Sequence, residues 1–448
     1  MYSVGCPTTS VDVRRRPVVE YHRLDPADAA ALASGLGGAA VVRQLRDAQL
    51  SRNLLLLKYV CQEWSADRGS LDAAVGVLAE AQRVQPQVFA DLMSDPLVSA
   101  WLAKTTRRLR DPATTTAELA ADLLHIGGLA ASAAVSVGLE CEVTGHTRRG
   151  RLTLPGLGEV LLTGEPDGSV PLRISDSMLM SPAAALVSPL REGGDGWLEL
   201  RRLTADHDAL SSTVTVEDGN PYRDGYHAAP SGRLTSVEVD AWQRLFAGAW
   251  ELIGCCLPER ASELAVGLRC LVPLVDDGRG AARSGTAWDS VGAVGLTRPR
   301  SAADFAVTLV HEFQHSKLSS ALDLVTLYVP DGPERHAAPW RTDPRPTSGL
   351  IQGVYAFLGV ADTWRALRAA PGLEELATRQ FAVTREQVRR GLDALEGSAE
   401  LTSAGRAFAA GMRSSLDSLL AQRLPPAVVE RTAPVVQQQQ AARSSAPR

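Results

Sequence analysis

The chain lacks the features that mark secreted, disulfide-stabilised or membrane-embedded proteins. It has only six cysteines, with no CxxC pair, and the adjacent Cys255 and Cys256 are poorly placed to bond each other. The N-terminal segment has no apolar signal-peptide core. The most apolar stretch, which contains His125, is short and rich in Ala and Gly, so we expect a buried helix rather than a membrane span. These absences predict a soluble protein of the reducing cytoplasm with no membrane partner.

Lysine is also scarce, because only Lys58, Lys104 and Lys317 occur and nearly all of the 46 basic residues are arginine. The 51 acidic residues bring the net charge to -5. No overall basic field is therefore present to attract nucleic acid. The length of 448 residues exceeds the ~150 typical of one domain, so we expect two or three structural units.

The spacing of apolar residues changes along the chain and predicts an α+β fold, mainly helical with a β-rich middle region. Apolar residues recur every three or four positions in residues 1–139, which we interpret as an N-terminal helical region. Residues 140–235 alternate with a period of two between turn residues and form the β-rich middle. Helical spacing returns in residues 236–430, the predicted catalytic region. Residues 431–448 are polar and of low complexity, and we expect a disordered tail.

The sharpest chemical signal is an HExxH motif that runs from His311 through Glu312 to His315. Only on a helix do residues i and i+4 project from one face, where two imidazoles can reach one metal ion. Ser301 followed by Asp304 is typical of a helix start. On this helix the histidines and Glu312 share a polar sector and the opposite side is apolar. We therefore predict that His311 and His315 are metal ligands on a long buried helix.

The residues after the motif weaken a peptidase interpretation. Leu318 and Ala321 stand where a metzincin would have Gly and His. Glu334 lies downstream, but the composition around it predicts a loop rather than the second helix that a zinc peptidase with a Glu ligand requires. With zinc, Glu312 would be a general base. With iron, it would be an acceptor that orients a ligand.

Longer segments suggest a family. HEFQHSKLSSALDLVTLY and APWRTDPRPTSGLIQGVYAFLGVADTW resemble the HExxH-motif peptide-modification proteins, also called 2-oxoglutarate-dependent HExxH-type peptide β-hydroxylases, and the resemblance covers nearly the whole chain. It implies a non-haem Fe(II) centre that uses O2 and 2-oxoglutarate to hydroxylate a β-carbon of a ribosomally made precursor peptide. A radical SAM maturase is a further partner that it implies.

Such an oxygenase needs a cation for the distal carboxylate of 2-oxoglutarate and three protein ligands on one face of the iron. Arg341 and Arg345, in WRTDPRP, are planar bidentate donors and are the predicted cofactor-binding residues. Gln352 is the predicted third ligand. His336 and Asp343, in the loop between the two helices, remain alternatives, whereas Asp323 lies two turns beyond the second histidine and is too far along the helix.

Two other residues have weaker signals. Lys317 points away from the histidines, and we expect it to form a buried ion pair or to serve packing. His227, in a loop, is a candidate for contact with the cavity or the peptide. Three hypotheses follow from the sequence: an Fe(II)/2-oxoglutarate peptide hydroxylase, a zinc metallopeptidase that processes such a peptide, and a metal-free scaffold that binds the peptide for a neighbouring maturase.

Overall fold

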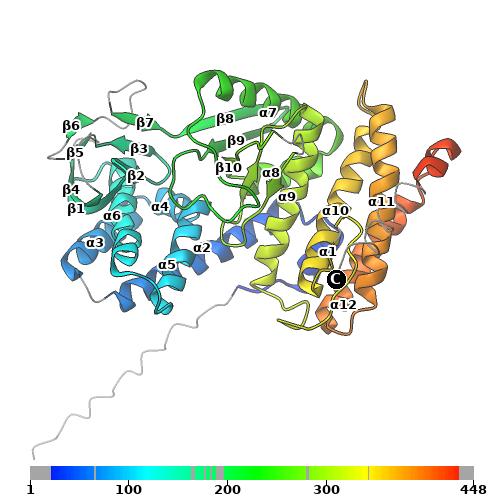
Figure 1. The fold of residues 1–448 in the computed structure, drawn as a ribbon, viewed down its shortest axis with the longest axis horizontal. Helices are drawn as coiled ribbons and strands as arrows, with labels where there is room; N and C mark the ends of the chain where they lie inside the picture. Colours follow the sequence, from blue (N-terminus) through cyan, green and yellow to red (C-terminus); the bar gives the residue numbers. More distant parts are fainter. Residues whose placement is uncertain are drawn as a thin grey trace, which may run out of the picture.

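The computed structural model describes residues 22–64, 67–162, 167–175, 178–181, 184–187, 196–278, 282–341 and 343–432. Within these ranges the protein is a mixed α+β structure, mainly helical with a β-rich middle, as predicted (Figure 1). The N-terminal segment, with Cys6, and residues 433–448 of the predicted disordered tail lie outside the described residues. The described cysteines are all free thiols.

Helices make up the first part of the described chain and most of its last part. Their starts follow local signals: Asp95 caps the helix that begins at Pro96, and Thr115 forms a capping box with Glu118. The helices before the first sheet are α1 (Pro26–Ala33), α2 (Gly38–Glu63), α3 (Arg68–Val84), α4 (Pro86–Met93), α5 (Pro96–Arg110) and α6 (Thr116–Val137). The later helices are α7 (Ser236–Cys256), α8 (Pro258–Gly267), α9 (Ala302–Leu322), α10 (Thr347–Leu367), α11 (Glu374–Glu396) and α12 (Ser403–Leu420).

The first sheet is antiparallel and has seven strands in the order β6-β5-β4-β1-β2-β3-β7. Its strands alternate buried and exposed side chains, as Val170, Leu172 and Ile174 show on one strand. This alternation confirms the period of two read from the sequence. The strands are β1 (Cys141–Arg148), β2 (Arg151–Leu154), β3 (Gly158–Leu161), β4 (Gly168–Ser175), β5 (Met178–Ser181), β6 (Ala184–Val187) and β7 (Trp197–Glu199).

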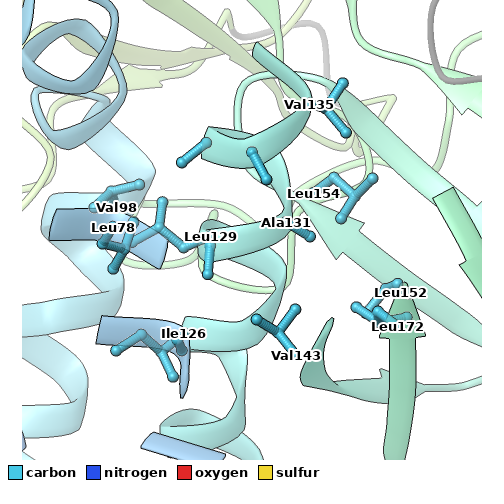
Figure 2. Packing of buried hydrophobic residues seen from close by; sticks show 14 of the residues in the cluster. Leu78, Val98, Ile126, Leu129, Ala131, Val135, Val143, Leu152, Leu154 and Leu172 are labelled. Atoms are coloured by element: carbon cyan, nitrogen blue, oxygen red, sulfur yellow. The ribbon is translucent and has the colours of Figure 1, made fainter. Parts of the chain in front are cut away.

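Helix α6 lies between this sheet and the N-terminal helices. Figure 2 shows Leu129 of α6 beside Leu78 and Val98, while side chains of the sheet lie on the other side of the helix. At Gly127 an added Cβ would come within 1.8 Å of the carbonyl oxygen of Thr144, so the close approach of helix and sheet requires glycine there. Among the described residues α6 alone is long and apolar enough to cross a membrane, and 83% of its apolar window is buried. This burial fits the predicted core helix of a soluble protein.

The second sheet joins strands from two of the predicted regions. Its order is β11-β12-β10-β9-β8, with β10 parallel to both of its neighbours and β11 antiparallel to β12. The predicted boundary at residue 235 therefore cuts through this sheet, because hydrogen bonds join strands on both sides of it. The strands are β8 (Arg201–His207), β9 (Leu210–Val216), β10 (Cys270–Pro273), β11 (Ser284–Gly285) and β12 (Ala293–Leu296).

The C-terminal helices form a bundle that also includes the start of the described chain. Leu32 of α1 and Val41 and Leu45 of α2 belong to the same buried cluster as Leu350 of α10 and Phe381 of α11. The predicted N-terminal region, residues 1–139, is thus divided among three cores, because Val42 of α2 belongs to the cluster of α7 and the second sheet. Helix α9 lies where this bundle meets the second sheet, and that position determines the surroundings of the HExxH motif (Figure 1).

Candidate metal centre on helix α9

The HExxH motif lies on a helix, as its spacing predicted. Ser301 caps α9, and its hydroxyl accepts a hydrogen bond from the backbone N–H of Asp304 at 3.1 Å. Phe305, Leu309 and Phe313 bury one side of α9 in a core that includes α7 and the second sheet. Because α9 is packed on that side and also against α10, the direction in which the motif faces is fixed.

The two imidazoles of the motif lie side by side. The rings of His311 and His315 meet edge to face, with centroids 4.9 Å apart and planes at 83°. Burial, with repulsion from His315, lowers the pKa of His311 to about 4, although 22% of its side chain is exposed. His311 is therefore neutral at pH 7 and retains a nitrogen lone pair, the form in which histidine binds metal ions.

Gln352 of α10 contacts the second histidine. Its Oε1 lies 3.0 Å from Nδ1 of His315, and its Nε2 donates a hydrogen bond to the hydroxyl of Ser319 at 3.3 Å. With the amide held this way, Nδ1–H of His315 donates to Gln352 and Nε2 is left for a metal. The geometry supports Gln352 as the residue that orients His315. Acting as the third ligand would require this hydrogen bond to be exchanged for a metal bond.

Glu312 is buried, and two hydroxyl groups hold its carboxylate. Ser284 donates to Oε1 and Thr286 to Oε2, each at 2.7 Å. Oε1 lies 3.9 Å from Nε2 of His311, so the carboxylate stays beside the histidine pair. Because both oxygens already accept a hydrogen bond, this arrangement suits an acceptor that fixes the site better than a base that must exchange protons freely.

Aromatic rings form an apolar wall beside the histidines. The edge of His311 meets Phe357 of α10 at a centroid distance of 5.1 Å, and Phe357 stacks on Trp340 at 4.6 Å. Trp340 lies directly over Gly353, where an added Cβ would come within 2.2 Å of the indole. Glycine at this position lets the tryptophan approach α10, and the two rings limit access of water to the histidines.

The two predicted arginines differ in how they are engaged. Arg341 donates from Nε to Asp343 at 2.9 Å, whereas Arg345 lies 3.6 Å from the same carboxylate. The guanidinium of Arg345 extends over Gly349 of α10, about 3 Å from where a Cβ would be. Gly349 precedes Gln352 by three residues, a rise of ~4.5 Å along α10. Of the two arginines, Arg345 therefore has the freer charge and lies beside the start of α10, the helix that carries Gln352.

The other residues considered from the sequence lie away from the pair or are engaged elsewhere. His336 contacts Thr347 at 2.9 Å and Glu334 at 3.3 Å, and so ties its loop to the bundle. Asp323 ends α9 and pairs with Arg52 on α2. His227 is exposed and lies against Gly285. Because side chains alternate along an extended segment, this face of Gly285 is opposite to the face from which Ser284 and Thr286 project.

A second group of possible ligands was not expected from the sequence. His207, at the end of β8, brings Nδ1 to 3.0 Å from Glu251 of α7, and Cys255 donates to the other oxygen of that carboxylate at 3.4 Å. All three ligand atoms lie within 4.8 Å of one another. Among the described residues, no third His, Cys, Asp or Glu completes such a group with His311 and His315.

No protein-family model matches the chain, and no curated protein matches it significantly. The argument about function therefore depends on the site. Two adjacent imidazoles, one held neutral, suit a divalent first-row metal, and the amide oxygen of Gln352 is an uncharged neighbour. This donor set adds no negative charge.

Proposed function

We propose that this protein is an Fe(II)/2-oxoglutarate-dependent β-hydroxylase of a ribosomally synthesised precursor peptide. The proposal rests on two contacts of α10, one with His315 and one with Arg345. Gln352 on that helix contacts His315, and three residues earlier Gly349 makes room for the guanidinium of Arg345. That spacing is comparable to the length of a five-carbon dicarboxylate whose other end chelates a metal held by the histidine pair.

Each residue of the site then has a stated task. His311 and His315 hold the metal, and bound iron with 2-oxoglutarate supplies the oxidising chemistry. The amide oxygen of Gln352, which contacts His315 at 3.0 Å, would exchange that hydrogen bond for a metal bond as the third ligand. Arg345 would bind the distal carboxylate of the co-substrate through its planar fork. Glu312 accepts hydrogen bonds from the hydroxyl groups of Ser284 and Thr286, which keep its carboxylate beside the two histidines. The wall of Phe357 and Trp340 excludes water that would compete for the site.

The proposal also includes a peptide substrate, a radical SAM maturase as partner and a cytoplasmic location. These parts rest on the resemblance of the segments HEFQHSKLSSALDLVTLY and APWRTDPRPTSGLIQGVYAFLGVADTW to the peptide-modification proteins. The free thiols of the described cysteines are compatible with a reducing compartment.

The direct test is reconstitution. Protein loaded with iron without oxygen should add one oxygen atom to the neighbouring precursor peptide when 2-oxoglutarate and O2 are supplied, and should release succinate. Mass spectrometry of the peptide and quantification of succinate measure both products. A zinc peptidase would instead shorten the peptide without O2 or co-substrate. Such cleavage by the zinc-loaded protein, or an unchanged peptide with no bound metal, would contradict the proposal.

Replacing Arg345 with leucine should weaken 2-oxoglutarate binding by about 2 kcal/mol, or ~30-fold, because the distal carboxylate loses its charged partner. The effect is at the low end for such a pair because 35% of the Arg345 side chain is exposed. Lysine should rescue only part of the affinity, since it keeps the charge but loses the fork. Titration of the iron-loaded protein with 2-oxoglutarate measures the change. Arg341→Leu is the matched control, and unchanged affinity in the double variant would exclude this loop.

A further inference from the structure

A cleft away from the histidine pair carries an unusual concentration of arginine. It has a volume of about 620 Å³, within the ~300–1,000 Å³ typical of ligand sites, and lies between α5, α6, the β1–β2 hairpin and the segment of residues 218–233. Six cations and three carboxylates line it in a chain whose net charge is -5. We call it the arginine cleft. The cations are Lys104, Arg148, Arg149, Arg151, Arg223 and Arg233.

Half of these cations are already neutralised. Arg151 pairs with Glu159 at 2.8 Å, Lys104 with Asp224 at 2.8 Å, and Arg233 with Asp218 at 3.2 Å. For Arg148, Arg149 and Arg223, no carboxylate of the described residues lies within ion-pair distance. Each of the three carboxylates of the cleft thus has a paired cation, and the other three arginines have no ion-pair partner among the described residues, although Glu159 and Asp218 lie near enough to Arg223 to stabilise its charge in part.

Arg223 is the most informative of the three. Its Nε is fully buried and has no hydrogen-bond partner among the described residues. Burial lowers the pKa of Arg223, which is the sign of a charge held away from water without enough compensation. A buried guanidinium donor with no acceptor is costly, and an incoming oxyanion would satisfy it.

The rest of the lining indicates what kind of anion fits. Beside the arginines stand the buried rings of His125 and Tyr222, whose centroids are 4.7 Å apart, and the side chain of Asn220. Burial lowers the pKa of His125 to about 3, so it adds no charge at pH 7. Free cations mixed with paired carboxylates, aromatic rings and an amide suit a peptide, which brings carboxylates together with N–H donors.

The cleft is connected to the candidate metal centre by one segment of chain. Arg223 lines the cleft, and four residues later His227 lies against Gly285, so the two are at most ~14 Å apart along the chain. Ser284 and Thr286, on either side of Gly285, hold Glu312 beside His311. Residues 223–227 and the segment 284–286 thus connect the lining of the cleft to the surroundings of the histidine pair.

We infer that the arginine cleft binds an acidic segment of the peptide substrate, with Arg148 and Arg223 receiving its carboxylates. This inference rests on the proposed function for the identity of the occupant. The cleft would thus recognise the peptide at a distance from the modified residue. Substrate choice would then depend on acidic residues that are not themselves modified.

The test is a binding measurement that needs no metal, 2-oxoglutarate or O2. A fluorescein-labelled octapeptide of alternating Glu and Gly should bind the full chain with an affinity that falls as salt is raised. The same peptide with Gln in place of Glu should not bind. Arg148→Gln and Arg223→Gln should each weaken binding roughly tenfold. Arg43→Gln, at an exposed arginine of α2, is the matched control and should change nothing.

Each other outcome is decisive. Equal binding of the Glu and Gln peptides, no binding up to about 1 mM, or indifference to both arginine variants would overturn the inference. Arg148 is exposed, so Arg148→Gln should fold normally and still tests the cleft if Arg223→Gln perturbs folding. Inorganic phosphate that binds through the same arginines while the Glu peptide does not would identify a phosphate site and also overturn it. If the Glu peptide binds but the reconstituted protein does not hydroxylate the precursor peptide, the inference about the cleft is retained and only the proposed function is contradicted.

Discussion

Alanine at His311 or at His315 should abolish stoichiometric iron binding and hydroxylation while the fold stays intact. Each variant removes one of the two adjacent imidazoles. Even residues that only support a metal ligand cost ~10- to 100-fold in affinity when they are lost, so loss of a ligand itself should cost more. Metal content after anaerobic iron loading and desalting measures the effect, and circular dichroism checks the fold. Both histidines are partly exposed, which favours intact folding of the variants.

Two controls make this result specific. His227→Ala changes an exposed histidine that lies against Gly285, and it should keep its iron. His207→Ala removes one member of the second group, with Glu251 and Cys255. If both variants of the motif keep full iron content and His207→Ala loses it, the metal belongs to the second group and the proposed function fails.

The helix that carries the motif was predictable because its signals are local. Spacing of three and four residues gave the buried side of α9, and Ser301 followed by Asp304 marked its start. The buried α6 and the antiparallel strands were predictable for the same reason. Each depends on the periodicity of neighbouring residues rather than on distant contacts.

The division into regions was less predictable because it depends on pairing between distant segments. Strand β9 pairs with β10 across α7 and α8, and no local pattern reports that contact. The packing of α1 against α12 is likewise invisible in the spacing of either helix. The boundaries at residues 139 and 235 follow changes in periodicity, whereas the cores follow tertiary packing.

The surroundings of the motif were also only partly predictable. Ser284 and Thr286 alternate around Gly285 upstream of the motif, and a Ser-Gly-Thr strand was a signal that sequence reasoning did not use. That these hydroxyls reach Glu312 follows from the position of β11 beside α9. Gln352 as the third ligand stays a prediction. It lies beside His315, and its contact with Nδ1 of that histidine could be seen only in three dimensions.

Lys317 gives the second large expected effect, on stability. The sequence predicted a buried ion pair or packing, and Lys317 pairs with Glu263 at 2.7 Å with both side chains 1% exposed. Its ammonium also donates to the carbonyl oxygen of Gly35, which accepts from Gln314 of α9 as well. The pair thus fixes the α1–α2 turn against the helix that carries the histidines.

Replacing Lys317 with methionine should lower the free energy of unfolding by about 3 to 5 kcal/mol, because Glu263 is left buried and unpaired. The double variant Lys317→Met/Glu263→Gln should recover most of the loss, since the amide oxygen can still accept from the backbone N–H of Gly38. Urea denaturation measures both. Lys58→Met, at an exposed position of α2, is the matched control. A loss below 1 kcal/mol in the single variant would contradict a structural role for the pair.

The same pair predicts how the loss depends on pH. Burial lowers the pKa of Lys317 to about 8, from 10.5. Between these values the unfolded chain binds more protons at this site than the folded chain does, so the wild type gains stability there as pH rises. Lys317→Met lacks this gain. The difference in unfolding free energy between wild type and Lys317→Met should therefore grow as pH rises from 8 to 10, and a constant or shrinking difference would show that burial does not lower the pKa of Lys317.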